Sequence, residues 1–127
     1  MRRRVLYVDD DLTNLELFRL HFDAEFDVSL CNNPLEAVDL IKELDTPLVV
    51  TDYKMPEMNG MDLVREIKKD SPKTVCVLLS AYLDELIEIN GEILYDFVSK
   101  PYDIRGMVRL MKDAIEHFDA RNSSLEA

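Results

Sequence analysis

The order of apolar and amphipathic segments predicts an α/β fold, a doubly wound three-layer sandwich. Five short runs rich in Val and Leu lack regular polar alternation, as is typical of parallel strands buried on both faces. Between them, apolar residues recur three and four positions apart, which indicates amphipathic helices. Because crossovers between parallel strands are right-handed, alternating strands and helices should place helices on both faces of one parallel sheet.

The individual elements follow from these patterns. Strands are expected at residues 5–8, 28–30, 48–50, 75–79 and 97–98. A helix should follow each strand, and apolar positions on the buried faces of four of them include Leu15, Ile41, Ile67 and Met111. The second helix should begin after Asn33, which can cap it, with Pro34 in its first position. The fourth helix, at residues 83–89, should be short and end near Gly91.

Length and composition indicate one compact domain. The chain has 127 residues, of which 47% are hydrophobic, enough for a core of ordinary size. Residues 1–119 are predicted to form the domain, and residues 120–127, which lack apolar periodicity, to be a linker or an expression tail. The net charge of −11 argues against direct binding to nucleic acid, because phosphate backbones repel an acidic surface.

The cysteines, the histidines and the N-terminus give no sign of a metal-binding or secreted protein. Cys31 and Cys76 adjoin apolar runs and are expected to be buried free thiols, while His21 and His117 are expected at the surface or its boundary. The basic start precedes only four apolar residues, so no secretion signal is expected. No run could cross a membrane, and a cytoplasmic protein is therefore expected.

Chemically active side chains follow four of the five expected strands. Asp9, Asp10 and Asp11 follow the first, Asp52 ends the third, Ser80 ends the fourth and Lys100 follows the fifth. In an open parallel sheet, ligands bind beyond the carboxyl ends of the strands, so these groups should meet at one edge. An acidic triplet alone is more often a helix N-terminus, and a single Asp a turn residue. Only the combination of these side chains at four of the five strand ends points to a functional site.

Crowded carboxylates repel one another, and a hard dication relieves that repulsion. Mg²⁺ suits a site with a few carboxylates, water and a phosphate. A carboxylate can also attack phosphorus and form an aspartyl phosphate. Lys100 would add a second positive charge and Ser80 a hydrogen bond. These residues therefore predict Mg²⁺-dependent phosphoryl chemistry.

An ordered set of short motifs carries a resemblance to a known family. The set is Asp9-Asp10, then Asp52 with Met55-Pro56 and Gly60, then Ser80-Ala81, then Lys100-Pro101. It resembles the CheY-like receiver domain of two-component response regulators over residues 4–119. The resemblance implies a flavodoxin-like sheet with the strand order 2-1-3-4-5.

The resemblance also implies a role for each residue. Asp52 would be the phosphoacceptor, and Mg²⁺ would be bound by Asp10, Asp52 and the backbone carbonyl of Lys54, with Asp9 holding metal-bound water. Ser80 would be the switch hydroxyl, Phe97 the switch aromatic residue and Lys100 the family's active-site lysine. The peptide bond before Pro101 is expected to be cis. Asp11 matches no such role and is expected to cap a helix or be solvated.

Some features depart from the usual family pattern. Residues 83–95 lack the common small-residue pattern and are more similar to receivers attached to HD-GYP phosphodiesterases. The expected fourth helix lacks the Lys and Arg of the family's dimer interface, which leaves a phosphorylation-dependent dimer open. Lys54 and Tyr82 are expected to crowd the approach of water to phosphorylated Asp52, and so to slow its hydrolysis.

The functional expectation is a phosphorylation switch rather than an enzyme, with Mg²⁺-dependent self-phosphorylation and slow autodephosphorylation as its only reactions. Its partners would be a sensor histidine kinase or phosphotransfer protein and a downstream output domain or protein, with neither nucleic acid nor membrane contacted directly. The alternatives are an interaction module that works without phosphorylation and a Mg²⁺-dependent phosphohydrolase. The intact set of Asp52, Ser80 and Lys100 disfavours the first, and a chain too short for a lid domain disfavours the second.

Overall fold

A computed structural model describes residues 2–81 and 93–126. The strands are β1 (Arg3–Val8), β2 (Phe26–Cys31), β3 (Leu48–Asp52), β4 (Val75–Ser80) and β5 (Asp96–Ser99). The helices are α1 (Leu12–Phe22), α2 (Pro34–Leu44), α3 (Gly60–Asp70) and α4 (Ile104–Glu126). The helix expected at residues 83–89 and its end at Gly91 lie outside the described residues.

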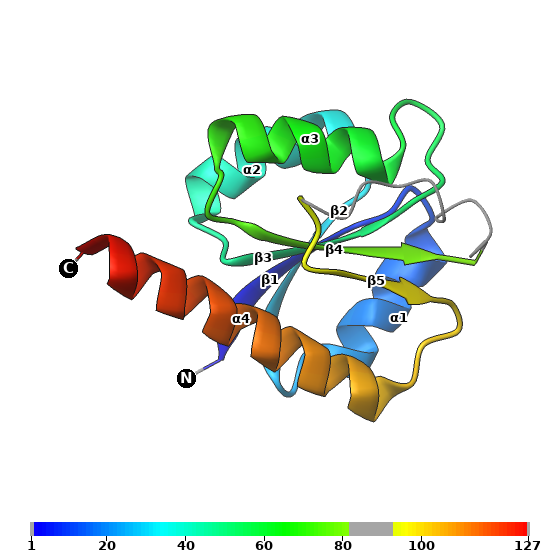
Figure 1. Cartoon of the computed structure of the whole chain (residues 1–127). Helices are drawn as coiled ribbons and strands as arrows, with labels where there is room; N and C mark the ends of the chain where they lie inside the picture. The colour runs from blue at the N-terminus through cyan, green and yellow to red at the C-terminus, as the bar shows by residue number, and fades with distance from the viewer. Residues whose placement is uncertain (1, 82–92, 127) are drawn as a thin grey trace.

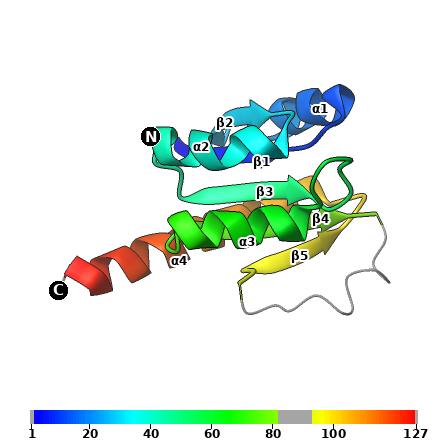
Figure 2. The ribbon, with the colours of Figure 1, turned by 90° about the horizontal axis from the view of Figure 1, so that it is seen from above.

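The strands form one parallel sheet in the order β2-β1-β3-β4-β5, which confirms the predicted fold class and strand order. Helices α2 and α3 cover one face of the sheet, and α1 and α4 cover the other (Figure 1). The view from above shows α2 and α3 side by side over the strands (Figure 2). No helix among the described residues has the length and hydropathy that a membrane span requires.

Each central strand contributes side chains to two cores, which explains why its sequence is apolar without a break. On β1, Val5 and Tyr7 belong to the core beneath α1 and α4, whereas Leu6 and Val8 belong to the core beneath α2 and α3. Strands β3 and β4 alternate in the same way. Burial of side chains on both faces is the main source of the stability of this layered fold.

The two edge strands differ from the prediction that all five would be buried on both faces. Of the four residues of β5, three are exposed and one is half-buried, and Phe97 is 46% exposed. In strand β2, three of the six residues are buried, two are half-buried and one is exposed. The apolar residues of β5 therefore do not mark a fully buried strand, because β5 has a neighbour on one side only.

The caps of the helices match the sequence signals. Asn33 caps α2 by accepting a hydrogen bond from the Leu35 N–H at 2.9 Å, with Pro34 at the first helical position. Asp11 caps α1 by accepting hydrogen bonds from Thr13 and Asn14, which confirms its expected capping role. Each cap satisfies backbone donors that the first turn of a helix leaves unpaired.

Helix α4 is longer than its apolar pattern suggested, because it continues to Glu126, through most of the segment expected to be a linker or tail. The boundary of the domain at residue 119 stays a prediction. Both thiols are buried and free, and His21 and His117 are half-buried and exposed respectively, as predicted.

Gly60 lets the start of α3 approach the chain that follows β3. A Cβ atom on Gly60 would lie 2.4 Å from the Asp52 carbonyl oxygen and 2.6 Å from Cδ1 of Leu78. The first contact is with backbone, which cannot rotate away. The Gly60 N–H also donates to the Tyr53 carbonyl at 2.7 Å. The site around Asp52 thus depends on the absence of a side chain at position 60.

The variant Gly60→Ala should lower the free energy of unfolding by at least the ~1–3 kcal/mol typical of an overpacked core. Urea denaturation followed by circular dichroism measures this. Gly106→Ala is the matched control, because its Cβ would meet only the side chain of Asp103, at 3.0 Å, and alanine favours a helix. Equal stability of the two variants would contradict the assigned role of Gly60.

Candidate functional site

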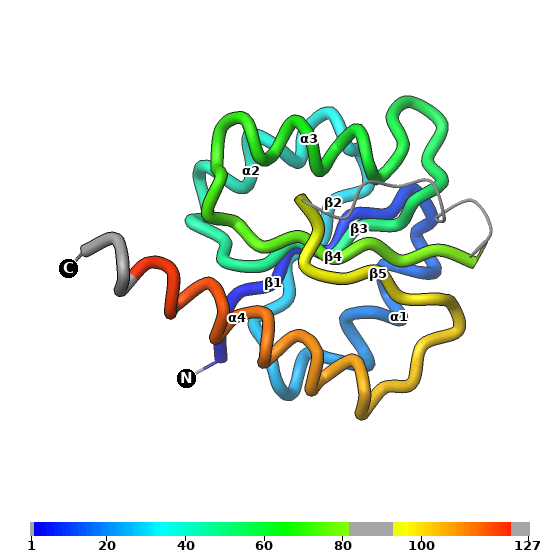
Figure 3. The backbone as a smooth tube through the Cα atoms, in the orientation of Figure 1, coloured from blue at the N-terminus to red at the C-terminus, as the bar shows by residue number. Residues whose placement is uncertain are grey.

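The side chains predicted to form the site do gather at the carboxyl edge of the sheet. The turn after β1, the loop after β3 and the loop between β5 and α4 all lie at this edge, as the backbone trace shows (Figure 3). One carboxylate oxygen from each of Asp9, Asp10 and Asp52 lies within 4.8 Å of the other two. Three acidic groups from two neighbouring strands thus share one small region.

The three carboxylates differ in exposure. Asp9 is fully buried, Asp52 is partly buried and Asp10 is exposed. Asp9 is held by hydrogen bonds on both oxygens, from the Tyr7 hydroxyl to Oδ2 at 2.6 Å and from the Asp11 N–H to Oδ1 at 3.0 Å. These bonds fix the orientation of Asp9, whereas Asp10 faces the solvent from which a ligand would come.

Lys100 supplies positive charge to this cluster. Its Nζ lies 2.8 Å from Oδ1 of Asp52 and 3.7 Å from Oδ2 of Asp9. The backbone N–H of Lys100 donates to the Ser80 carbonyl at 2.8 Å, which ties the end of β5 to the end of β4. The following peptide bond, Lys100–Pro101, is cis, as predicted.

Burial raises the pKa of Asp52, and the carboxylates of Asp9 and Asp10 raise it further, while the hydrogen bond and charge of Lys100 act in the opposite direction. The net rise means that the ionised carboxylate is less stable here than in water. Three carboxylates share this region with the one ammonium group of Lys100, so repulsion between them adds to the effect of burial. Burial and the bond to Asp9 raise the pKa of Tyr7 strongly, so its phenol stays protonated and acts as a donor.

The remaining predicted residues occupy distinct positions around the cluster. Ser80 is buried at the end of β4, one residue beyond Leu79, which pairs with Asp52 across the sheet. Lys54 is exposed in the loop after β3. Phe97 pairs with Leu78 and points its ring partly into solvent. Tyr82 lies outside the described residues, so its expected position is not tested.

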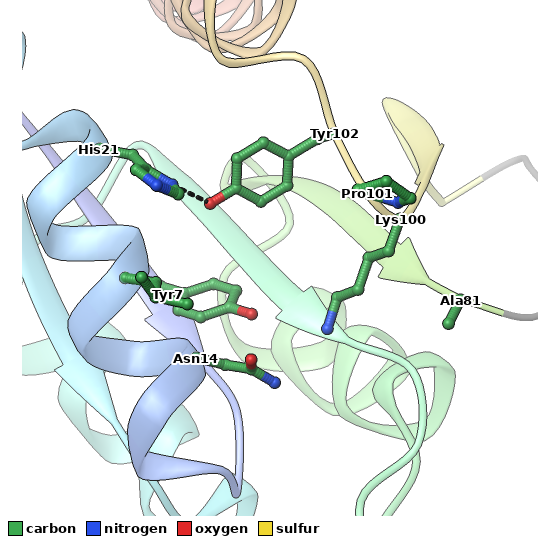
Figure 4. A pocket seen from close by; sticks show the side chains of 8 residues that line it. Tyr7, Asn14, His21, Ala81, Lys100, Pro101 and Tyr102 are labelled. Carbon is green, nitrogen blue, oxygen red and sulfur yellow. Dashed lines mark hydrogen bonds between the residues drawn. The ribbon is translucent and has the colours of Figure 1, made fainter.

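A cavity of about 370 Å³ adjoins the cluster between α1 and the loop that follows β5 (Figure 4). Its lining includes Tyr7, Lys100, Tyr102 and His21. The His21 Nδ1 lies 2.7 Å from the Tyr102 hydroxyl oxygen, a hydrogen bond that joins α1 to this loop. Sequence reasoning missed Tyr7, although its position two residues before Asp9 places both side chains on one face of the chain.

A parallel sheet of this order, with three carboxylates and a lysine at its carboxyl edge, is the arrangement that a receiver domain would have. Residues 5–112 match the family described as the response regulator receiver domain. The match spans most of the chain. This protein therefore belongs to the response regulator receiver family.

Curated relatives agree with this membership. The chain is 30% identical over 122 residues to the DNA-binding response regulator MtrA of Mycobacterium tuberculosis, covering 94% of this chain and 53% of that protein. It is 28% identical over 116 residues to the transcriptional regulatory protein ZraR of Klebsiella oxytoca, covering 89% of this chain and 26% of that protein. The chain thus spans about half of one relative and about a quarter of the other.

Solved structures share the fold. A response regulator receiver domain protein from Clostridium thermocellum superposes with a TM-score of 0.84 at 26% identity, covering 97% of this chain and 98% of that one. The signal receiver domain of an HD domain-containing protein from Pseudomonas fluorescens gives a TM-score of 0.82 at 23% identity, covering 94% of this chain and 99% of that one. The second likeness shows the fold alone, and the HD-GYP subtype stays a prediction.

Proposed function

We propose that Asp52 accepts a phosphoryl group from a histidine kinase or phosphotransfer protein, in a reaction that needs Mg²⁺, and that the phosphorylated domain switches conformation. The observation that carries this proposal is the 2.8 Å ion pair between Lys100 and Asp52, set within the cluster of three carboxylates. The pair favours the ionised form of Asp52 and so opposes the effect of burial. An ionised carboxylate is the form that can act as a nucleophile.

The donor set fits Mg²⁺. Three carboxylates within 4.8 Å provide the oxygen ligands that a hard dication prefers, and Lys100 is the cation that pairs with two of them. We assign direct binding to Asp10, Asp52 and the Lys54 carbonyl, with Asp9 acting through water. When bound, the ion would balance the charge of the carboxylates and of the phosphoryl oxygens.

The reaction itself is a transfer between two nucleophiles. A carboxylate oxygen of Asp52 forms a bond to phosphorus while the bond from phosphorus to the donor breaks, and the donor atom leaves with the electron pair. Lys100 faces Asp52 and can pair with a phosphoryl oxygen in the product. Positioning and charge stabilisation are the main contributions that a protein makes to phosphoryl transfer.

Acetyl phosphate, a small phosphodonor, tests the proposal without the unidentified kinase. Incubation with Mg²⁺ should add one phosphoryl group, seen by intact-mass spectrometry, and EDTA should prevent the addition. No addition in the presence of Mg²⁺ would favour an interaction module that works without phosphorylation. Continuous release of phosphate at many turnovers would instead favour a phosphohydrolase.

We propose that the conformational change runs through Ser80 and Phe97. Ser80 is buried beside the cluster, and its carbonyl binds the backbone of Lys100. A phosphoryl oxygen on Asp52 would attract the Ser80 hydroxyl and open space at the end of β4. The ring of Phe97, which is 46% exposed on the neighbouring strand, can fill that space. Packed cores tend to switch between discrete states in this way.

Beryllofluoride, which mimics a phosphoryl group, should therefore produce its largest amide shifts in NMR spectra between residues 80 and 102. The same addition to Asp52→Asn protein is the control and should leave the spectrum unchanged. Shifts confined to α1 and α2 would contradict the proposed route.

The partners and output follow from the proposed chemistry. We place the protein in the cytoplasm, where it would receive the phosphoryl group from a sensor kinase, act on an output domain or separate protein and lose the group by slow autodephosphorylation. Its net charge of −11 argues that this domain does not itself bind nucleic acid. Phosphorylation-dependent dimerisation is a further proposal, which size-exclusion chromatography with and without beryllofluoride tests.

A further inference from the structure

Tyr7 is a buried phenol aimed at the acidic cluster. It lies on β1 two residues before Asp9, and its hydroxyl donates to Oδ2 of Asp9 at 2.6 Å. Its ring stacks on Phe18 of α1, with ring centroids 4.1 Å apart and an interplanar angle of 6°. The ring is thus clamped between the sheet and α1, and its oxygen points toward the ammonium of Lys100 (Figure 4).

The oxygen of Asp9 that accepts the Tyr7 hydroxyl is also the one nearest to Lys100. Nζ of Lys100 lies 3.7 Å from this Oδ2 but 2.8 Å from Oδ1 of Asp52. Two carboxylates therefore compete for one ammonium group. Asp9, which is fully buried, would be the stronger competitor if its oxygens lacked other donors, because a buried carboxylate that lacks a hydrogen bond is costly.

Asp9 has those other donors. The Tyr7 hydroxyl satisfies Oδ2, and the Asp11 N–H at 3.0 Å satisfies Oδ1. Asp9 is consequently stable without a close contact to Lys100, and the ammonium can stay on Asp52.

We propose that Tyr7 is a positioning residue that reserves Lys100 for Asp52 by satisfying Asp9. The inference rests on the proposed function, since it concerns the lysine that assists phosphoryl transfer to Asp52. Without the hydroxyl, Oδ2 of Asp9 would recover a donor by drawing Lys100 toward it. Asp52 would then lose its ion pair, and phosphoryl transfer would slow.

Tyr7→Phe tests the inference, because it removes the hydroxyl and keeps the ring that stacks on Phe18. Tyr102→Phe is the matched control. Tyr102 is a second phenol lining the same cavity, but among the residues that the structure describes its hydroxyl bonds His21 and no carboxylate. Thermal denaturation of both variants checks that the fold is retained.

The first measurement is the position of Lys100 in the protein without Mg²⁺. In Tyr7→Phe, nuclear Overhauser contacts from the Lys100 Cε protons to the Asp9 Cβ protons should strengthen, and those to the Asp52 Cβ protons should weaken. Tyr102→Phe should match wild type. An unchanged pattern in Tyr7→Phe would overturn the inference, whatever the protein does with a phosphodonor.

The second measurement separates rate from metal affinity. With acetyl phosphate and saturating Mg²⁺, Tyr7→Phe should be labelled about tenfold more slowly than wild type, the effect expected from a charge-assisted hydrogen bond. Its Mg²⁺ affinity by calorimetry should stay the same or increase, because Lys100, which competes with the ion for the Asp52 carboxylate, has moved toward Asp9. A parallel fall in both rate and affinity would indicate a general structural role and overturn the inference. Absence of labelling in wild type would instead overturn the proposed function, and the contacts of Lys100 would still decide the role of Tyr7.

Discussion

Asp52→Asn should abolish labelling by acetyl phosphate. The amide nitrogen and oxygen of Asn are poor nucleophiles, and no acyl phosphate can form at that position. Asp9 and Asp10 are the alternative acceptors, but Asp9 is buried with both oxygens hydrogen-bonded, and Asp10 lacks the contact with Lys100 at 2.8 Å. Intact-mass spectrometry after incubation with Mg²⁺ and donor measures the loss. Labelling at the wild-type rate would mean that another side chain is the acceptor.

The same variant should be more stable than wild type when Mg²⁺ is absent. Burial and two neighbouring carboxylates raise the pKa of Asp52 above its unfolded value of about 3.9. The folded state therefore binds the Asp52 proton more readily than the unfolded state, and wild type loses stability as pH rises from the unfolded pKa through the folded one. The penalty is therefore larger at neutral pH than in acid, and Asn removes it.

Thermal melts in EDTA measure this difference. The melting temperature of Asp52→Asn should exceed that of wild type at neutral pH, and the gap should narrow as the pH falls toward the unfolded pKa of about 3.9, below which the carboxyl is protonated in both the folded and the unfolded state. A lower melting temperature of the variant at neutral pH would show that the ion pair with Lys100 outweighs burial and repulsion.

The site could be predicted from the sequence because strand ends are easy to recognise and a parallel sheet brings them together. The apolar runs stop at residues 8, 50, 79 and 98, and chemically active residues stand within two positions after each stop. The rule that sites lie at the carboxyl edge then needs no knowledge of loop structure. Part of the site lies in loops of irregular conformation, but the site could be located without predicting the conformation of these loops.

Exposure at the sheet edge and the length of the last helix were harder to predict. An apolar run has the same appearance in a central strand and in an edge strand, so the sequence of β5 does not reveal that Phe97 is half exposed. Helix α4 continues past Phe118 without apolar periodicity, since adding residues to an existing helix is far easier than starting one. Periodicity detects buried helix faces and does not detect helix ends.

The contact between Tyr7 and Asp9 was not predicted from the sequence, for a different reason. In an apolar run a tyrosine is ordinarily a core residue, and Tyr7 is indeed buried against Phe18. Its hydroxyl, however, must find a partner once buried, and the nearest polar group on the same strand face is Asp9. The rule that buried polar groups are hydrogen-bonded could have identified this pair from residue spacing alone.

Asp10→Asn should weaken Mg²⁺ binding by more than about tenfold, a loss that even supporting residues of metal sites commonly cause. Asp10 is the exposed member of the carboxylate cluster, so its charge is the one most available to an arriving ion. Asp11→Asn is the matched control, because it removes the same charge from the neighbouring residue. The side chain of Asp11 caps α1, and Asn caps a helix equally well. Calorimetric titration with MgCl₂ should show unchanged affinity for this control.

The comparison separates a ligand from a general electrostatic effect. If attraction by the net charge of −11 were enough to bind Mg²⁺, the two variants would lose the same small amount of affinity. If Asp10 is a ligand, only Asp10→Asn should lose most of its Mg²⁺-dependent labelling, and raising the Mg²⁺ concentration should restore part of it. Equal affinities of the two variants would remove Asp10 from the metal site, and the cluster would then have to bind the ion through Asp52 and the backbone alone.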